Sequence, residues 1–376
     1  MRNFLAKIFG RQRYIDKKEQ EERDAYIKSI LSFTKPIDNV SGFETGVEDF
    51  EEFDAIKGSI DKKIGGHLRK SFVKLHRGYF LELFAAIFRD YPNINFVTFL
   101  DEESIVKYAA TPENISAVVK QMGMSELKSR FDERKTMFAE SVVSQIMNFF
   151  GAKTVFNKAI QRDEEFYVLS VNFLKKGQMF FVADQLNKEL KIAGHQKIQE
   201  NLDAIDDKLD ILKTVIKFEM KQKNPKIDSR QIKEDYVYSY LVRNMLLGDR
   251  DFTDRNYGFV YDSTNNKVFA APGFDYELSF DVKPENTPYF ERNMEYIFNH
   301  YHGVFVKFKK MLEEFTQIDK KTKKQLFEVF IESEVPNKNV AFEMIEFLKA
   351  TSQSLISVMG KIEESSKNSR NSKILG

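Results

Sequence analysis

Three side chains near residue 260 have the types and spacing that phosphoryl transfer requires. Asp251 and Asn256 are five positions apart, and Asp275 follows after a segment with the pattern of a short β-hairpin. In Mg²⁺-dependent phosphoryl transfer, one carboxylate orients the attacking hydroxyl and accepts its proton, while an amide and a second carboxylate hold the metal. The sequence therefore predicts Asp251 as the catalytic residue and Asn256 and Asp275 as metal ligands.

The hairpin is the element that must bring these side chains together. Residues 257–262 and 267–274 have strand patterns, and residues 263–266 have the composition of a turn. A hairpin centred on that turn pairs positions whose numbers sum to about 530, so Asn256 would lie beside residues 273–275. The alternative is a surface hairpin in which Asp and Asn only form turns, but the combined spacing favours a site.

The same region carries a family resemblance. The segments LLGDRDFTDRNYGFV and KVFAAPGFDYELS resemble the signature of the HipA-like serine/threonine kinases, in which G-N-x-D-x-H-x-x-N-x-G-F precedes A-P-x-[FY]-D. The resemblance gives Asp251 the catalytic role and Asn256 and Asp275 the metal-binding roles. The chain departs from the pattern at two positions, because Thr253 stands where the family usually has His and Asp249 where it usually has Asn.

A fainter resemblance extends over residues 104–182. It implies that Glu140, on a helix predicted over 138–150, pairs with an ATP-binding lysine, for which Lys107 is the candidate. An ordinary lysine at a strand edge remains the alternative for Lys107. The strand predicted over 168–173 would be the hinge, with adenine met by backbone groups of Ser170, Val171 and Asn172.

The surrounding elements predict an α+β protein. Helix and strand patterns mix up to residue 184, and helical patterns dominate afterwards, with an apolar stripe over 198–215. Together with the resemblance, this order implies a bilobal protein-kinase-like fold with a small mixed N-lobe and a larger, mainly helical C-lobe. The predicted parts are a charged N-terminal extension (1–60), the N-lobe (61–184), the C-lobe (185–365) and a disordered tail (366–376).

The composition of the chain excludes several other classes. The 58 basic and 57 acidic residues leave a net charge of +1, so no global field attracts nucleic acid, and no nucleic-acid partner is expected. The absence of cysteine excludes disulfides and cysteine-based zinc sites. No apolar run is long enough for a transmembrane segment. We expect a cytoplasmic protein, with a secreted effector as the alternative; the basic N-terminus fits either peripheral membrane contact or a docking helix.

Three functions stay open at this stage. The first is an ATP- and Mg²⁺-dependent serine/threonine kinase that phosphorylates a protein of unknown identity, itself included. The second is a pseudokinase or interaction protein that keeps the fold, motivated by Thr253 and by the lack of a recognisable glycine-rich phosphate loop. The third is a two-metal enzyme acting on phosphate esters, which gives Asn256 no role and uses Asp249, Asp251, Asp254 and Asp275.

Overall fold

The computed structural model of the chain describes its central and C-terminal parts most fully. The described residues are 46–47, 69–76, 114–122, 133–155, 157–162, 165–171, 173, 178–186, 192, 196–218, 220–222, 224–276, 278–280, 282–286, 289–318, 331–332 and 338–374. Lys107, Asn172 and nearly all of the predicted N-terminal extension lie outside these residues.

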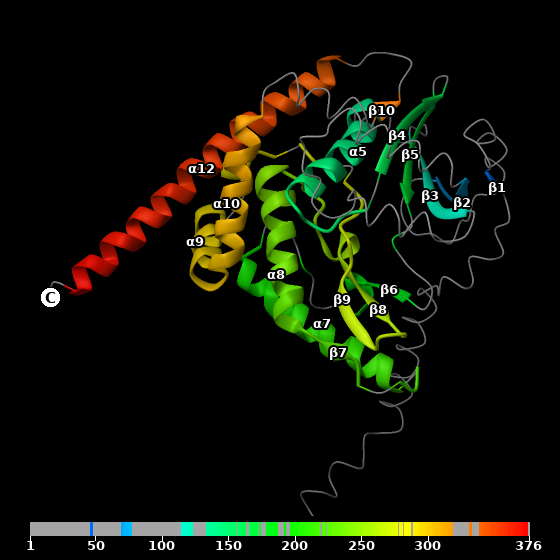
Figure 1. Ribbon diagram of the computed structural model, residues 1–376, viewed down its shortest axis with the longest axis horizontal. Coiled ribbons are helices and arrows are strands. Elements are labelled where there is room, and N and C mark those ends of the chain that lie inside the picture. The colour runs from blue at the N-terminus through cyan, green and yellow to red at the C-terminus, as the bar shows by residue number, and fades with distance from the viewer. Residues whose placement is uncertain are drawn as a thin grey trace, which may run out of the picture.

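A six-stranded sheet lies at one end of the molecule (Figure 1). Its strands follow the spatial order β1-β2-β3-β5-β4-β10. They are β1 (Gly46–Val47), β2 (Arg69–His76), β3 (Asn114–Met122), β4 (Asn157–Arg162), β5 (Glu165–Val171) and β10 (Ile331–Glu332). The strands from β2 to β4 pair antiparallel, and β1 and β10 pair in parallel at the two edges.

Helix α5 (Glu133–Phe149) packs against β4 and β5 of this sheet. Its buried apolar residues recur at helical spacing, with Ala139, Val142 and Ile146 almost fully buried. They join Val168 of β5 in one hydrophobic core. The pattern over 138–150 thus predicted this helix correctly, and the buried face of α5 fixes the position of Glu140 relative to the sheet.

A second, four-stranded sheet contains the predicted hairpin. Its order is β6-β8-β9-β7, with β6 (Gln178–Val182), β7 (Lys226–Ile227), β8 (Gly258–Asp262) and β9 (Lys267–Ala270). Strands β8 and β9 pair Phe259 with Ala270 and Asp262 with Lys267, within a single residue of the predicted register. Asp262 closes the turn, because its Oδ1 accepts hydrogen bonds from the backbone N–H groups of Thr264 and Asn265.

The other described helices are α6 (Ala183–Leu186), α7 (Ile198–Phe218), α8 (Ser229–Tyr240), α9 (Phe290–His300), α10 (His302–Gln317) and α12 (Lys338–Ile374), with short 3-10 turns at Asp254–Asn256 and Pro284–Asn286. Helices α9 and α10 lie at the end of the molecule away from the six-stranded sheet (Figure 1). The stripe predicted from Ile198 to Val215 is the buried face of α7. Helix α8 begins at the N-cap Asp228, whose side chain accepts a hydrogen bond from the Gln231 backbone.

Helix α8 continues directly into a π-helical segment, Leu241–Leu246, in which every residue is buried. The wider turn is visible in the bond from Leu247 N to Val242 O, which spans five residues. Single π-helical turns are frequent at functional sites. Arg243 is one of the residues of this π-helical segment.

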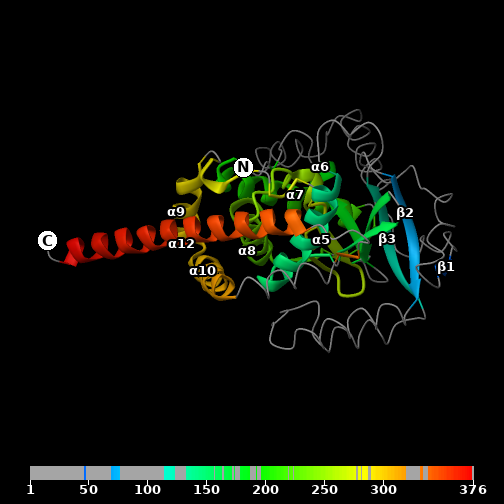
Figure 2. The ribbon, with the colours of Figure 1, turned by 90° about the horizontal axis from the view of Figure 1, so that it is seen from above.

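Helix α12 runs to Ile374 and extends beyond the other helices (Figure 2). The tail predicted to be disordered over 366–376 is therefore helical up to Ile374, which corrects the prediction. The sequence from Lys361 to Ile374 contains no proline or glycine, so nothing interrupts the hydrogen bonding that the preceding turns start.

The architecture is mixed α+β, as predicted. The boundaries assigned to the two lobes stay a prediction. None of the described helices is long and apolar enough to cross a membrane.

Candidate active site

The loop that we call the acidic loop, residues 248–256, follows the π-helical segment. Gly248 opens it with φ at 58°, a left-handed conformation that L side chains rarely adopt. A Cβ atom at this position would lie 2.1 Å from the carbonyl oxygen of Val282. Glycine is thus required where the chain turns out of the helix and into the loop.

Asp251 and Asn256 are hydrogen bonded to one another across the acidic loop. Asn256 Nδ2 donates to Asp251 Oδ2 at 2.8 Å and to the Asp251 carbonyl at 2.9 Å. Because the amide nitrogen faces Asp251, the amide oxygen is the atom of Asn256 left for a cation. The pair predicted from the five-residue spacing is therefore brought together by the structure.

The segment after the hairpin, residues 273–276, carries Asp275. Its φ of 60° is in the left-handed region, an uncommon conformation for a residue other than glycine. The segment is tied to the chain that follows α5: Gly273 N donates to Lys153 O at 2.8 Å, and Val155 N donates to Gly273 O at 3.0 Å. Thr154 Oγ1 and the Tyr276 hydroxyl share a hydrogen bond of 2.6 Å.

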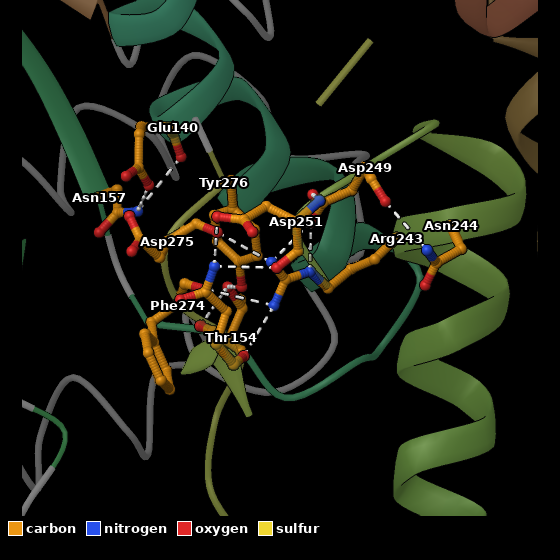
Figure 3. Close-up of polar contacts among 12 residues, drawn as sticks. Glu140, Thr154, Asn157, Arg243, Asn244, Asp249, Asp251, Phe274, Asp275 and Tyr276 are labelled. Atoms are coloured by element: carbon orange, nitrogen blue, oxygen red, sulfur yellow. Dashed lines mark hydrogen bonds and ion pairs between the residues drawn. The ribbon is translucent and has the colours of Figure 1, made fainter. Parts of the chain in front are cut away.

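Arg243 connects the acidic loop with the 273–276 segment (Figure 3). Its Nε and Nη2 atoms each lie 2.6 Å from Asp249 Oδ2. Nη1 donates to the carbonyls of Asn256 and Phe274 at 3.2 Å, and Nη2 donates to the Asp275 carbonyl at 2.8 Å. Arg243 was not predicted from the sequence, although a charged residue among the apolar residues Leu241, Val242, Met245 and Leu246 indicates a buried arginine with partners.

The electrostatics of Asp251 reflect its neighbours. Burial raises the pKa of its carboxyl above the ordinary value of 3.8, and the charges of Asp249 and Asp275 raise it further. The hydrogen bond from Asn256 and the charge of Arg243 act in the opposite direction on that pKa. A carboxylate with a raised pKa is a stronger proton acceptor, which suits a general base.

The other two acidic residues of the loop are committed to buried ion pairs. Asp249 is fully buried against Arg243, and Asp254 is almost fully buried, with Oδ2 3.3 Å from Lys208 Nζ. Among the described residues, no group of three or more His, Cys, Asp or Glu side chains is arranged to hold a metal ion. The two-metal cluster considered from the sequence therefore does not form.

Glu140 of α5 is buried and bonded to β4. Asn157 Nδ2 lies 3.2 Å from Glu140 Oε2 and 3.2 Å from the Glu140 carbonyl. Ser170 Oγ donates to Asn157 Oδ1 at 2.6 Å. Ser170 of β5 is thus linked through Asn157, a residue the sequence analysis did not select, to the helix glutamate.

Two of the three residues predicted to contact adenine, Ser170 and Val171, lie on β5. Ser170 pairs with Val118 of β3 on one side and Asn157 of β4 on the other, and Val171 pairs with Ala117 of β3. Ser170 lies between two strands and Val171 is the last residue of β5, and their role as adenine contacts stays a prediction. The prediction for Asn172, after the end of the strand, lies outside the described residues.

Lys107 lies outside the described residues as well, so its predicted pairing with Glu140 stays a prediction. The strand register draws attention to a second lysine. Lys120 on β3 is in register with Val168 of β5, and Val118 is in register with Ser170. Residues in register share a side of the sheet, and Val168 belongs to the core formed with α5. Position 120 is therefore on the side of the sheet that α5 covers.

Comparisons with known proteins found similarity to solved structures alone. No protein-family model matches the chain, and no curated protein does. Among solved structures, it is similar to the Helicobacter pylori proinflammatory kinase CtkA, with 14% identity and a TM-score of 0.44, over 68% of this chain and 90% of that one. It is also similar to a chain of the Shewanella oneidensis HipA–HipB toxin–antitoxin complex with operator DNA, with 10% identity and a TM-score of 0.39, over 66% and 59%.

Proposed function

We propose that the chain is an ATP- and Mg²⁺-dependent serine/threonine protein kinase of HipA-like type. The observation that carries the proposal is the joint placement of Asp251, Asn256 and Asp275. The first two are hydrogen bonded to one another, and one buried arginine binds the backbone of both Asn256 and Asp275. In this proposal the six-stranded sheet with α5 belongs to the smaller lobe, and helices α7 to α12 belong to the larger one.

The side chains of this set fit a magnesium ion. Mg²⁺ prefers oxygen ligands and is usually held by one or two carboxylates together with substrate phosphates. The carboxylate of Asp275 and the amide oxygen of Asn256 are ligands of this kind. The pKa of Asp251 is raised by burial first and then by the charges of Asp249 and Asp275, and a cation would offset the contribution of these two charges.

Each residue of the site has its own role in phosphoryl transfer. Asp251 orients the acceptor hydroxyl and takes its proton, because its carboxylate is held by Asn256 and is made more basic by its surroundings. Asn256 and Asp275 hold the metal. Bound Mg²⁺·ATP supplies the γ-phosphoryl group and the positive charge that neutralises its oxygens. Glu140 helps to position the lysine that binds the phosphates.

The test is transfer of labelled γ-phosphate to the protein itself and to a generic basic protein substrate, in Mg²⁺ and in Mn²⁺. Wild type is measured beside Asp251→Ala and Asp275→Ala. We expect label on the wild type and none above background on either variant. Label that persists in both variants would contradict the assignment of the site.

The pseudokinase alternative is separated by the same protein samples. If the wild type transfers nothing but Mg²⁺·ATP raises its melting temperature, the fold has been kept without catalysis. If ATP neither shifts the melting temperature nor labels the protein, the nucleotide site itself is wrong.

The identity of the phosphate-binding lysine is tested by two matched variants. We favour Lys120 over Lys107, since the register puts position 120 on the side of the sheet that α5 and Glu140 cover. Lys120→Met should weaken ATP binding and abolish transfer, while Lys107→Met should leave both near wild type. The opposite result would restore Lys107.

A further inference from the structure

The side chain of Arg243 is enclosed by other residues of the described part of the chain. It is fully buried, and its guanidinium lies 4.6 Å from the ring centres of both Phe252 and Tyr276. The two rings belong to the two segments that carry the proposed functional residues, the acidic loop and the 273–276 segment. Such contacts with aromatic faces favour a planar guanidinium and restrict its orientation.

The bonds of this one group reach all three proposed functional residues. Arg243 donates directly to the carbonyls of Asn256 and Asp275, the two proposed metal ligands. It reaches Asp251 through Asp249: Asp249 Oδ2 accepts from the guanidinium, and Asp249 Oδ1 accepts from the backbone N–H of Asp251 at 2.9 Å. The distances between these three residues therefore depend on the same side chain, which Figure 3 shows with Asp249, Phe274 and Asp275.

This arrangement gives a physical reason for the departure from the HipA-like pattern at position 249. An asparagine there could accept the Asp251 N–H, but it would leave a buried guanidinium without a counter-charge, which is costly. Asp249 does both, and Asn244 Nδ2 further fixes its carbonyl at 2.9 Å. Asp249 thus pairs with Arg243 rather than holding the metal.

We propose that Arg243, with Asp249, is a positioning residue that couples the acidic loop to the 273–276 segment and sets their separation for phosphoryl transfer. The proposal rests on the proposed function for its effect on rate. Its structural half, the coupling of the two segments, stands without that function. Lysine cannot replace the arginine, because an ammonium group lacks the planar set of donors that reaches four acceptors at once.

The test compares Arg243→Lys with Arg230→Lys, a matched substitution in α8, the helix that leads into the π-helical segment, at a side chain that is 86% exposed. Transfer is measured at a temperature at which far-UV circular dichroism shows each protein folded. We expect kcat of Arg243→Lys to fall about 100-fold, the order expected from a misplacement of about 1 Å. The Mg²⁺ concentration for half-maximal rate should rise as well. Arg230→Lys should match the wild type in both.

Hydrogen–deuterium exchange supplies a readout that does not need activity. In Arg243→Lys, peptides covering 248–256 and 273–280 should both exchange faster, while peptides of α7 stay as in the wild type. Asp249→Asn is a second variant in case Arg243→Lys does not fold, and it should give the same joint change with a loss in kcat of about tenfold.

The outcomes separate the two proposals. If the wild type is active and Arg243→Lys keeps kcat within twofold, the positioning role is wrong and the kinase proposal stands. If the wild type is inactive, the kinase proposal fails, and exchange alone decides the coupling. Exchange that changes in one segment only, or in neither, would overturn the coupling in either case.

Discussion

Two buried ion pairs hold the acidic loop, and they differ in how completely their charges are bonded. Arg243 and Asp249 are both fully buried, with both Asp249 oxygens accepting hydrogen bonds. Lys208 of α7 and Asp254 are buried almost as deeply, at a distance of 3.3 Å. Asp254 Oδ1 accepts from Ile192 N at 2.6 Å, but Oδ2 finds no hydrogen-bond partner within the described part of the chain.

The difference follows from the chemistry of the two cations. A guanidinium presents several donors in one plane, whereas an ammonium group is a compact point charge. The consequence appears at Asp254, where burial raises the pKa from 3.8 to about 6 despite the opposing effect of Lys208. The carboxylate of Asp249 is thus held in place by Arg243. The carboxyl of Asp254, which is paired with Lys208, takes up a proton in mildly acidic solution.

Breaking the arginine pair should have the largest effect on stability. Arg243→Met leaves Asp249 buried without a counter-charge, and removing one partner of a buried pair costs about 3 to 5 kcal/mol. Unfolding in guanidinium chloride measures the loss. A loss under about 1 kcal/mol would mean that the pair is not buried as described, since only exposed pairs are worth so little.

Breaking the lysine pair should cost less. Lys208→Met also leaves a buried carboxyl, but Asp254 can become neutral by taking up a proton, because its pKa already lies near 6. We expect a loss of about 2 kcal/mol at pH 7, the cost of an unsatisfied buried polar group. The same unfolding experiment checks it. A loss equal to that of Arg243→Met would remove the distinction between the two pairs.

The smallest and most specific effect is on the pH dependence of stability. The folded pKa of Asp254, about 6, exceeds its unfolded value of 3.8, so the folded state binds the proton more tightly. The stabilising contribution is complete below about pH 4 and is lost as the pH rises through about 6. The free energy of unfolding of wild type, relative to Asp254→Asn, should therefore decrease between pH 4 and pH 7. A difference that is constant over this range would contradict the raised pKa.

The proposed chemical residues were accessible to sequence analysis because their geometry is local. The spacing of Asp251 and Asn256 and the length of the hairpin placed three residues together, and the register of β8 and β9 agrees with that expectation. The roles of Asp249 and Asp254 were not accessible. Their partners, Arg243 and Lys208, lie in helices whose packing against the loop depends on the tertiary fold.

Among the elements of the fold, too, some could be predicted from the sequence and others could not. Apolar periodicity predicted α5 and α7, because each buries one stripe of side chains against the core. Composition alone failed at the C-terminus: serine, asparagine and lysine suggested disorder, but α12 continues through them as a helix. The π-helical turn that contains Arg243 leaves no periodic pattern, since it changes the helix by a single residue.

The most direct test of the active-site assignment is ATP binding measured calorimetrically with and without Mg²⁺. The account predicts that wild type and Asp251→Asn bind ATP more tightly in Mg²⁺, because the metal ligands Asn256 and Asp275 are intact in both. Asp275→Asn should lose this dependence on Mg²⁺. If Asp275→Asn kept the full dependence, or if the wild type bound no ATP, the assignment of the acidic loop and the 273–276 segment as a Mg²⁺·ATP site would be contradicted.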